Sequence, residues 1–266
     1  MLRDVLRKLA ECQLGLDEAE RLIRAALNIE VVEGLVRLDV GRECRRGVPE
    51  IILASGKPPS LVVKAAAEMA KRTGKVIVSR AEPIHAELLV KELGAGFEVE
   101  FHEASRLLVA KRSGTKVEDG LGRVGVLAAG TADLAVVEEV EVVAREMGCE
   151  VFKALDVGVA GLTRLRDALS MLWDADVDVI VVVAGREGAL PSVVAGLVDV
   201  PVIGVPTSTG EGVGGRGVAA LLSMLQSCSL GVAVVNVDGG VAAGVVASLI
   251  ARRAARFRAR REVQEA

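Results

Sequence analysis

The sequence predicts an α/β protein that has a doubly wound parallel sheet over residues 121–266 and a smaller helical and α/β domain over residues 1–120. From Arg123 onward, five apolar runs of strand length alternate with helical stretches, which is typical of a parallel sheet covered on both faces. Turn residues cluster between Ser113 and Gly120, which favours a domain boundary there. The 266 residues are 51% hydrophobic, so the chain can bury a sizeable core.

The elements of both domains follow from periodicity. Over residues 1–37, apolar side chains recur at helical spacing, which predicts helices. Short strands are predicted at 51–54 and 75–79, on either side of a helix near 59–73. The C-terminal sheet is predicted from strands at 124–129, 151–157, 177–184, 200–205 and 231–237, with helices near 133–147, 163–174, 190–198, 216–228 and from 237 to near 260.

Composition argues against several classes of partner. The chain has 33 basic and 36 acidic side chains, and its net charge of -3 argues against nucleic acid or an anionic membrane surface. Aromatic residues make up only 2%, too few for a base-stacking platform. The four cysteines are far apart in the sequence, which argues against a disulfide framework or a structural zinc site.

The start of the sequence does not resemble a secretion signal. The first residues carry charges and no apolar run of the kind found in secretion signals, so we expect a cytoplasmic protein. The longest charge-free stretch, residues 217–237, is long enough to span a bilayer. Polar residues inside it, such as Gln226 and Asn236, argue against a span, and we expect no membrane partner.

A small-residue loop follows each predicted strand of the C-terminal sheet. In a doubly wound sheet, ligands bind beyond the carboxyl ends of the strands, where the strand order reverses. We therefore expect these loops to converge on one edge and to form the substrate site. The loops are residues 129–133, 156–161, 184–192, 206–217 and 236–240.

The 207–217 loop fits a phosphate-binding turn because it has five glycines, three hydroxyl side chains and Arg216. A flexible glycine-rich connection is the alternative. No Gly-Lys-Ser/Thr follows this loop, so it is not a Walker A loop. The residues expected to bind the substrate are Gly130, Thr131, Asp133, Asp156, Gly158, Gly185, Thr207, Ser208, Gly210, Gly212 and Asp238.

The charged residues of these loops each have two interpretations. Arg186 and Glu187 are isolated charges in a long apolar stretch, a position typical of ligand-facing groups, although Glu187 could instead cap the following helix. Asp133 could likewise bind a ligand or cap a helix. Asp156 and Asp238, each at a strand end, could bind ribose hydroxyls or organise turns.

Cys228 differs from the other cysteines because it lies between two serines, at the end of a glycine-led helix and directly before a strand. A buried thiol that packs as a small apolar group is the usual case, and a nucleophile is the alternative. The two histidines, His85 and His102, belong to the N-terminal half. Their position argues against a Ser-His-Asp or Cys-His triad at the loops.

Long motifs in both halves are similar to a known family. In the N-terminal half these are Leu38-Asp39, Arg42, Arg46-Gly47, Pro49-Glu50 and Gly56-Lys57. In the C-terminal half they are residues 130–139, 156–162, 184–194 (A-G-R-E-G-A-L-P-S-V-V), 201–208 and 222–228 (L-S-M-L-Q-S-C). Together they resemble the LarB family, whose C-terminal domain is similar to PurE, a flavodoxin-like aminoimidazole ribonucleotide (AIR) carboxylase or mutase.

This resemblance implies carboxylation of the pyridinium ring of nicotinic acid adenine dinucleotide by CO2, with hydrolysis of the phosphoanhydride and release of AMP. The product would be pyridinium-3,5-biscarboxylic acid mononucleotide, which opens nickel-pincer nucleotide biosynthesis. By the same resemblance, Cys228 is the nucleophile of M-L-x-S-C, and Glu187 of A-G-x-E-G-A-L activates water. The resemblance also implies a homo-octamer or at least a dimer. For the reaction itself we expect no organic cofactor, and Mg²⁺ could help the glycine-rich loop to hold the phosphates.

The chemistry suits these residue types. Addition of a thiolate breaks the aromaticity of an electrophilic pyridinium ring and creates an enamine that can attack CO2. A carboxylate can then activate water against the phosphoanhydride. Two alternatives stay open: a PurE-like AIR carboxylase or mutase, which the lack of histidine in the C-terminal half disfavours, and a non-catalytic nucleotide-binding paralogue.

Five positions depart from the family pattern and leave the exact nucleotide open. The family has an aromatic residue at Glu211 and Met at Arg186, so a stacking partner is lost and a charge is added beside the proposed water activator. The other departures are Ala132, Thr163 and Gly239. In the N-terminal domain, the residues that could reach anionic substrate groups, or lie on a solvated surface, are Arg42, Arg45, Arg46 and Lys57.

Overall fold

The computed structural model describes residues 2–27, 30–32, 36–115 and 120–265. The chain forms two compact units, Met1–Lys116 and Val117–Ala266, which we call the N-terminal unit and the C-terminal unit. Both units combine helices with β-sheets, so the predicted α/β class is confirmed.

The C-terminal unit contains a parallel sheet of five strands. They are β7 (Arg123–Ala128), β8 (Glu150–Ala154), β9 (Val179–Ala184), β10 (Val202–Pro206) and β11 (Val232–Val234). Their order in the sheet is β11-β10-β9-β7-β8, which is flavodoxin-like. The predicted doubly wound sheet is therefore confirmed, and its order reverses between β7 and β9, where a ligand crevice is expected.

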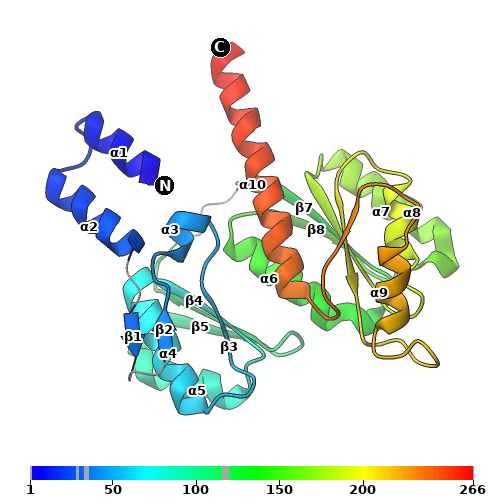
Figure 1. Cartoon of the computed structure of the whole chain (residues 1–266), viewed down its shortest axis with the longest axis horizontal. Coiled ribbons are helices and arrows are strands. Elements are labelled where there is room, and N and C mark those ends of the chain that lie inside the picture. Colours follow the sequence, from blue (N-terminus) through cyan, green and yellow to red (C-terminus); the bar gives the residue numbers. More distant parts are fainter. Residues whose placement is uncertain (1, 28–29, 33–35, 116–119, 266) are drawn as a thin grey trace. The chain divides into compact units, whose positions relative to one another are not determined.

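Helices cover both faces of this sheet (Figure 1). On one face, α6 (Leu134–Glu146) and α10 (Gly240–Glu265) enclose a core that includes Val126 and Val181. On the other face, α7 (Leu162–Asp174), α8 (Leu190–Ala195) and α9 (Val218–Leu225) pack around Leu127 and Val182. All residues of β9 are buried, which is why its sequence is continuously apolar rather than alternating. Short 3₁₀ turns, η2 (Thr131–Asp133) and η3 (Val159–Gly161), precede α6 and α7.

The N-terminal unit has a four-stranded sheet in the order β3-β4-β6-β5, in which only β3 and β4 are parallel. The strands are β3 (Ile51–Leu53), β4 (Lys75–Ser79), β5 (Phe97–His102) and β6 (Leu107–Arg112). Two helices, α4 (Pro59–Thr73) and α5 (Pro83–Leu93), form a core with this sheet around Met69, Val78 and Leu89. The other elements are α1 (Leu2–Ala10), α2 (Leu16–Leu27), the antiparallel pair β1 (Glu30–Val32) and β2 (Val36–Leu38), α3 (Arg42–Arg46) and η1 (Gly94–Gly96).

Most predicted elements are confirmed, including all five βα units. The helical expectation over residues 1–37 holds as far as α2 and is wrong for β1 and β2, because strands of three residues are too short to show a period. Residues 28–29 and 33–35 of that prediction lie outside the described residues. In the part of the chain that the structure describes, no helix is long and apolar enough to cross a bilayer.

Candidate active site

Left-handed backbone conformations gather at the carboxyl edge of the C-terminal sheet. A residue other than glycine with positive φ follows each of four strands: Asp156 (φ 58°) after β8, Arg186 (48°) after β9, Arg216 (59°) after β10 and Asp238 (53°) after β11. Such a conformation costs about 1–3 kcal/mol and persists only where the surroundings fix it, which is common at functional sites. The strain therefore marks this edge as the candidate site.

A cavity of about 490 Å³ opens beyond the carboxyl ends of β7, β8 and β9. Its place, at the reversal of strand order, is the one predicted for the ligand. Six residues that the sequence predicts as site residues line it: Gly130, Asp133, Asp156, Gly158, Gly185 and Glu187. The other lining residues are Ala129, Ala132, Val159, Ala160, Arg164, Ala184, Arg186, Ala189, Leu190, Thr209 and Glu211.

Asp133 is a structural anchor of this cavity. Its side chain is buried, and one carboxylate oxygen accepts hydrogen bonds from the hydroxyls of Thr207 (2.7 Å) and Thr209 (3.1 Å). The other oxygen accepts the backbone N–H of Gly130 at 3.2 Å. Because these bonds occupy both oxygens, Asp133 joins the loops that follow β7 and β10. Asp133 is the N-cap residue of α6, but its side chain makes no capping hydrogen bond to that helix.

Two glycines of the predicted site serve the packing of one loop on another. A Cβ atom on Gly185 would lie 2.5 Å from the hydroxyl of Thr209, and one on Gly210 would lie 2.8 Å from the backbone nitrogen of Arg186. Both positions therefore require glycine so that the loops after β9 and β10 can touch. Asp238 likewise organises a turn, since its carboxylate accepts the backbone N–H of Ser208 at 2.9 Å.

The charges that remain available in the cavity are Arg186, Glu187 and Glu211. Within the described part of the chain, none of the three makes a hydrogen bond or an ion pair. Glu187 does not cap α8, because the N-cap residue is Ala189 and no side chain caps that helix. An exposed carboxylate without a partner beside an arginine is free to contact a substrate or a water molecule.

Arg164 is a cavity residue that sequence reasoning missed. It lies in the first turn of α7 and forms an ion pair with Asp156, which comes two residues after the end of β8. Its position in the sequence could have indicated this role, because a basic residue in the first turn of a helix lies close to the loop that precedes the helix. With Arg186, it gives the cavity two guanidinium groups, which match the geometry of phosphate and carboxylate oxygens.

The remaining predicted residues lie outside the cavity lining. Thr207 is fully buried and supports Asp133. Thr131, Ser208 and Gly212 are exposed on the loops around the cavity. The structure therefore brings together the β7, β8 and β9 loops at the cavity, whereas the 207–217 loop contributes mainly Thr209 and Glu211 to its lining.

Cys228 is exposed, in contrast to Cys149, whose thiol is buried and has its pKa raised by burial. It follows α9 and precedes β11, so it lies toward the amino ends of the strands and does not line the cavity. Its neighbours are fixed on α8: the hydroxyl of Ser227 donates to the Ser192 hydroxyl (2.9 Å), and that of Ser229 donates to the Ser192 carbonyl (2.7 Å). The thiol of Cys228 and the carboxylate of Glu187 therefore do not share this cavity in one chain.

Two further expectations concern metals and the N-terminal unit. Within the described residues, no three or more His, Cys, Asp or Glu side chains gather as a set that could hold a metal ion. In the N-terminal unit, Arg42 pairs with Glu50 at 2.9 Å and Arg45 pairs with Asp39 at 2.6 Å. These two arginines therefore stabilise their own segment, while Arg46 and Lys57 are exposed.

Comparison with known proteins agrees with both units. Residues 123–265 match AIR carboxylase, and residues 30–112 match the LarB/PurE-like N-terminal domain. An uncharacterised protein of Methanocaldococcus jannaschii is 41% identical over 255 residues, which cover 94% of this chain and 97% of that protein. The resemblance to LarB is thereby confirmed at the level of the family. Because the first match spans more than half of the chain, the protein belongs to the AIR carboxylase family, as a member that carries a LarB/PurE-like N-terminal domain.

Proposed function

We propose that this carboxylase-family protein carboxylates the pyridinium ring of nicotinic acid adenine dinucleotide and hydrolyses its phosphoanhydride. The observation that carries the proposal is the carboxylate of Glu187, which has no partner among the described residues and lines a cavity with Arg164 and Arg186. The arginines suit the phosphate oxygens of a dinucleotide. The carboxylate suits a water molecule that must lose a proton.

The first step is nucleophilic. The thiolate of Cys228 adds to a carbon of the cationic ring, and the ring electrons that are displaced make an enamine. The enamine carbon attacks CO2 and forms the new carbon–carbon bond. Loss of the ring proton and expulsion of the thiolate then restore the aromatic ring, so the cysteine is regenerated and no redox partner is needed.

The second step is hydrolytic. Glu187 accepts a proton from water as the water oxygen attacks the phosphoanhydride, and AMP leaves. The guanidinium groups of Arg164 and Arg186 stabilise the charge that develops on the phosphate oxygens. The protein offers no preformed carboxylate cage in its described part, so Mg²⁺ would be held largely by the substrate phosphates.

A PurE-like reaction on AIR is the second candidate, because the C-terminal unit matches AIR carboxylase. That chemistry moves a proton on a neutral ring, which favours a group that titrates near neutrality. Both histidines of the chain, His85 and His102, belong to the N-terminal unit. The C-terminal sequence therefore favours the pyridinium reaction, which uses a thiol and a carboxylate.

The test incubates the protein with nicotinic acid adenine dinucleotide and isotope-labelled bicarbonate. We expect AMP and a mononucleotide heavier by one labelled CO2, together with a transient adduct on Cys228 in the intact protein mass. Parallel reactions contain AIR instead. AMP release without a carboxylated product, or turnover of the imidazole substrate alone, would contradict the proposal.

A further inference from the structure

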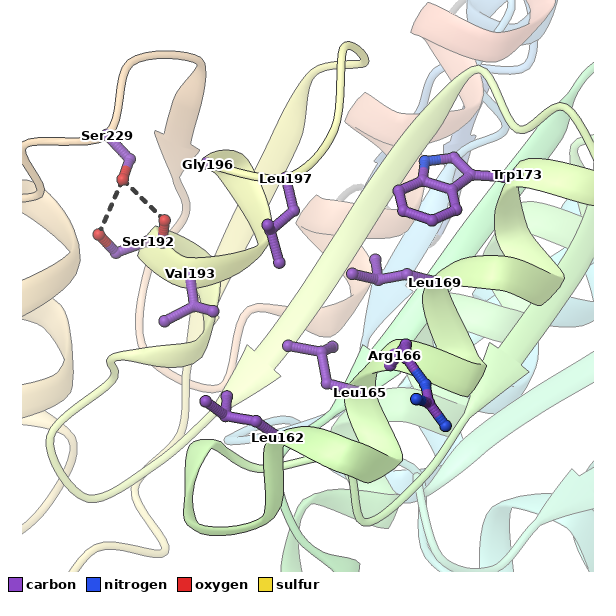
Figure 2. A pocket seen from close by; sticks show the side chains of 10 residues that line it. All are labelled: Leu162, Leu165, Arg166, Leu169, Trp173, Ser192, Val193, Gly196, Leu197 and Ser229. Carbon is purple, nitrogen blue, oxygen red and sulfur yellow. Dashed lines mark hydrogen bonds between the residues drawn. The ribbon is translucent and has the colours of Figure 1, made fainter.

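Two hollows on the C-terminal unit differ in the groups that they offer to a ligand. The groove between α7 and α8, of about 620 Å³, is lined mainly by leucine side chains and Trp173 (Figure 2). Its two serines, Ser192 and Ser229, bond each other, as Figure 2 shows. The cavity that contains Glu187 is lined instead by carboxylates and guanidinium groups. A polar ligand such as a nucleotide therefore fits the cavity rather than the groove.

Most charged groups of the cavity already have a partner or a role. The carboxylate of Asp133 joins two loops, and Asp156 forms an ion pair with Arg164. In the proposed reaction, Glu187 accepts a proton from water. Glu211 also lines the cavity, but it makes no hydrogen bond or ion pair with any residue that the structure describes, and neither proposed step uses it.

The backbone just before Glu211 is anchored. The hydroxyl of Thr209 donates to the carboxylate of Asp133 at 3.1 Å. Gly210 packs on the next loop so closely that a Cβ atom there would lie 2.8 Å from the backbone nitrogen of Arg186. The side chain of Glu211 is exposed. An anchored segment thus carries a carboxylate that keeps its full capacity to accept hydrogen bonds.

A carboxylate is complementary to only some groups of a nucleotide. An ionised carboxylate accepts hydrogen bonds and donates none, so it repels phosphate oxygens and attracts hydroxyls and amines. A ribose presents two adjacent hydroxyls, and one carboxylate can accept both of them. The exocyclic amine of adenine offers a single nitrogen. The ribose diol is therefore the neutral group that a carboxylate matches best.

The cationic pyridinium ring is the other group that a carboxylate attracts. In the proposed first step, addition of the thiolate removes the positive charge of the ring. A carboxylate beside the ring would stabilise the charged ring more than the uncharged adduct, and it would slow that step. A ribose keeps the same charge throughout the reaction, so a carboxylate can bind it without this cost.

Two other aspartates that the sequence suggests for ribose hydroxyls are engaged elsewhere. Asp156 pairs with Arg164, and Asp238 accepts the backbone N–H of Ser208 at 2.9 Å. Asp238 also lies outside the cavity lining. Glu211 lines the cavity and is subject to neither constraint.

We propose that Glu211 binds the 2′- and 3′-hydroxyls of a ribose of the substrate and makes the site reject nucleotides that carry a 2′-phosphate. Such a phosphate removes one donor and brings negative charge to the carboxylate. Acidic residues in dinucleotide-binding folds recognise the ribose 2′-hydroxyl in the same way. The inference rests on the proposed function and names the residue that determines specificity at the ribose. Both riboses of the dinucleotide adjoin its phosphates, so the test has one arm for each.

The test measures binding by isothermal titration calorimetry, without turnover. The adenosine arm compares AMP with its 2′-deoxy and 2′-phosphorylated forms. The pyridine arm compares nicotinic acid mononucleotide with its own 2′-deoxy and 2′-phosphorylated forms. Each ligand is titrated into the wild type, Glu211→Ala and Glu150→Ala. Glu150 is the matched control, because it is an exposed glutamate at the start of β8, at the amino edge of the sheet.

In one of the two arms, we expect the wild type to bind the 2′-deoxy form about 10-fold more weakly than the parent nucleotide, because a hydrogen bond to a charged group is lost. The 2′-phosphorylated form should bind more weakly still. Glu211→Ala should bind the parent nucleotide about 10-fold more weakly and should no longer distinguish it from the 2′-deoxy form, because the same bond is already absent. Glu150→Ala should behave as the wild type.

The arm that shows this pattern identifies the ribose. If Glu211→Ala discriminates against the 2′-deoxy forms as strongly as the wild type does in both arms, the inference is overturned. Tight binding of both 2′-phosphorylated forms by the wild type also overturns it. Either result leaves the proposed function intact if labelled bicarbonate still enters the product. Ribose discrimination through Glu211 without carboxylation contradicts the proposed function alone, and a wild type that binds none of these nucleotides overturns both.

Discussion

The two edges of the C-terminal sheet differ in what they contain: the carboxyl edge has a cavity, and the amino edge has an exposed cysteine. At the carboxyl edge, Asp133 bonds Gly130, Thr207 and Thr209, and the loops form a cavity with polar groups of their own. Toward the amino ends, Cys228 is exposed between the exposed side chains of Leu225 and Leu230. The difference shows that one chain by itself forms the cavity that contains Glu187, whereas Cys228 does not line that cavity.

Removal of the thiol is expected to have the largest effect. Cys228→Ala should abolish ring carboxylation, because no other cysteine lies among the loops or the cavity lining. The carboxylated mononucleotide is measured by mass spectrometry. Cys12→Ala, which removes another exposed thiol, should keep wild-type activity. Carboxylation by Cys228→Ala at the wild-type rate would place the nucleophile elsewhere.

Neutralisation of the cavity carboxylate separates the two steps. Glu187→Gln should slow AMP release by about 10²–10⁴-fold, because it removes the group that takes the proton from water. Ring carboxylation should continue, so a carboxylated dinucleotide accumulates, which chromatography detects. Glu98→Gln, an exposed change in the N-terminal unit, should leave both steps unaltered. Equal loss of both steps would mean that Glu187 binds the substrate rather than water.

The anchor of the carboxyl edge can be tested by stability. Asp133→Ala leaves the buried Thr207 hydroxyl and the Gly130 N–H without their acceptor, and each such group costs about 1–3 kcal/mol. Urea unfolding of the protein should report this loss. Asp167→Ala, an exposed position on α7, should leave the unfolding free energy unchanged. A stable Asp133→Ala protein would mean that the loops are joined by other groups.

The smallest effect concerns the buried thiol. Burial raises the pKa of Cys149, so its thiolate fraction at pH 8 is below that of an ordinary cysteine. In a chain that keeps only Cys149, modification by a thiol reagent should be slow and should quicken as pH rises toward the raised pKa. A chain that keeps only Cys228 should react at once. Equal rates would contradict the burial difference between these two cysteines.

Much of the cavity could be predicted from the sequence, because the apolar runs of the sequence show where the strands end. Gly130, Gly158 and Glu187 each follow an apolar run, and parallel strands bring such positions to one edge. Arg164 could not be found this way, since it lies within a helix and its pairing with Asp156 depends on how α7 leaves the loop. The roles of Gly185 and Gly210 also needed coordinates, because their neighbours belong to different loops.

The N-terminal unit shows the same limit. Its strand β3, helix α4 and strand β4 are clear in the sequence because an apolar period changes at each boundary. The pair β5 and β6 has no counterpart among the sequence predictions, because its stability comes from cross-strand pairing rather than from a local signal. From the sequence alone, Arg42 and Arg45 could bind a ligand or lie on a solvated surface. The structure shows that they pair with Glu50 and Asp39.

By itself, the sequence determined the alternation of strands and helices, the edge at which the loops meet and the residues that mark the family. Each of these follows from the spacing of apolar residues or from short motifs of neighbouring residues. Only the tertiary structure decided that Asp133 is an anchor and that Glu187 stays available. It alone also placed Cys228 outside the cavity. The physical reason is that hydrogen bonds, burial and distance between residues far apart in the chain exist only after packing.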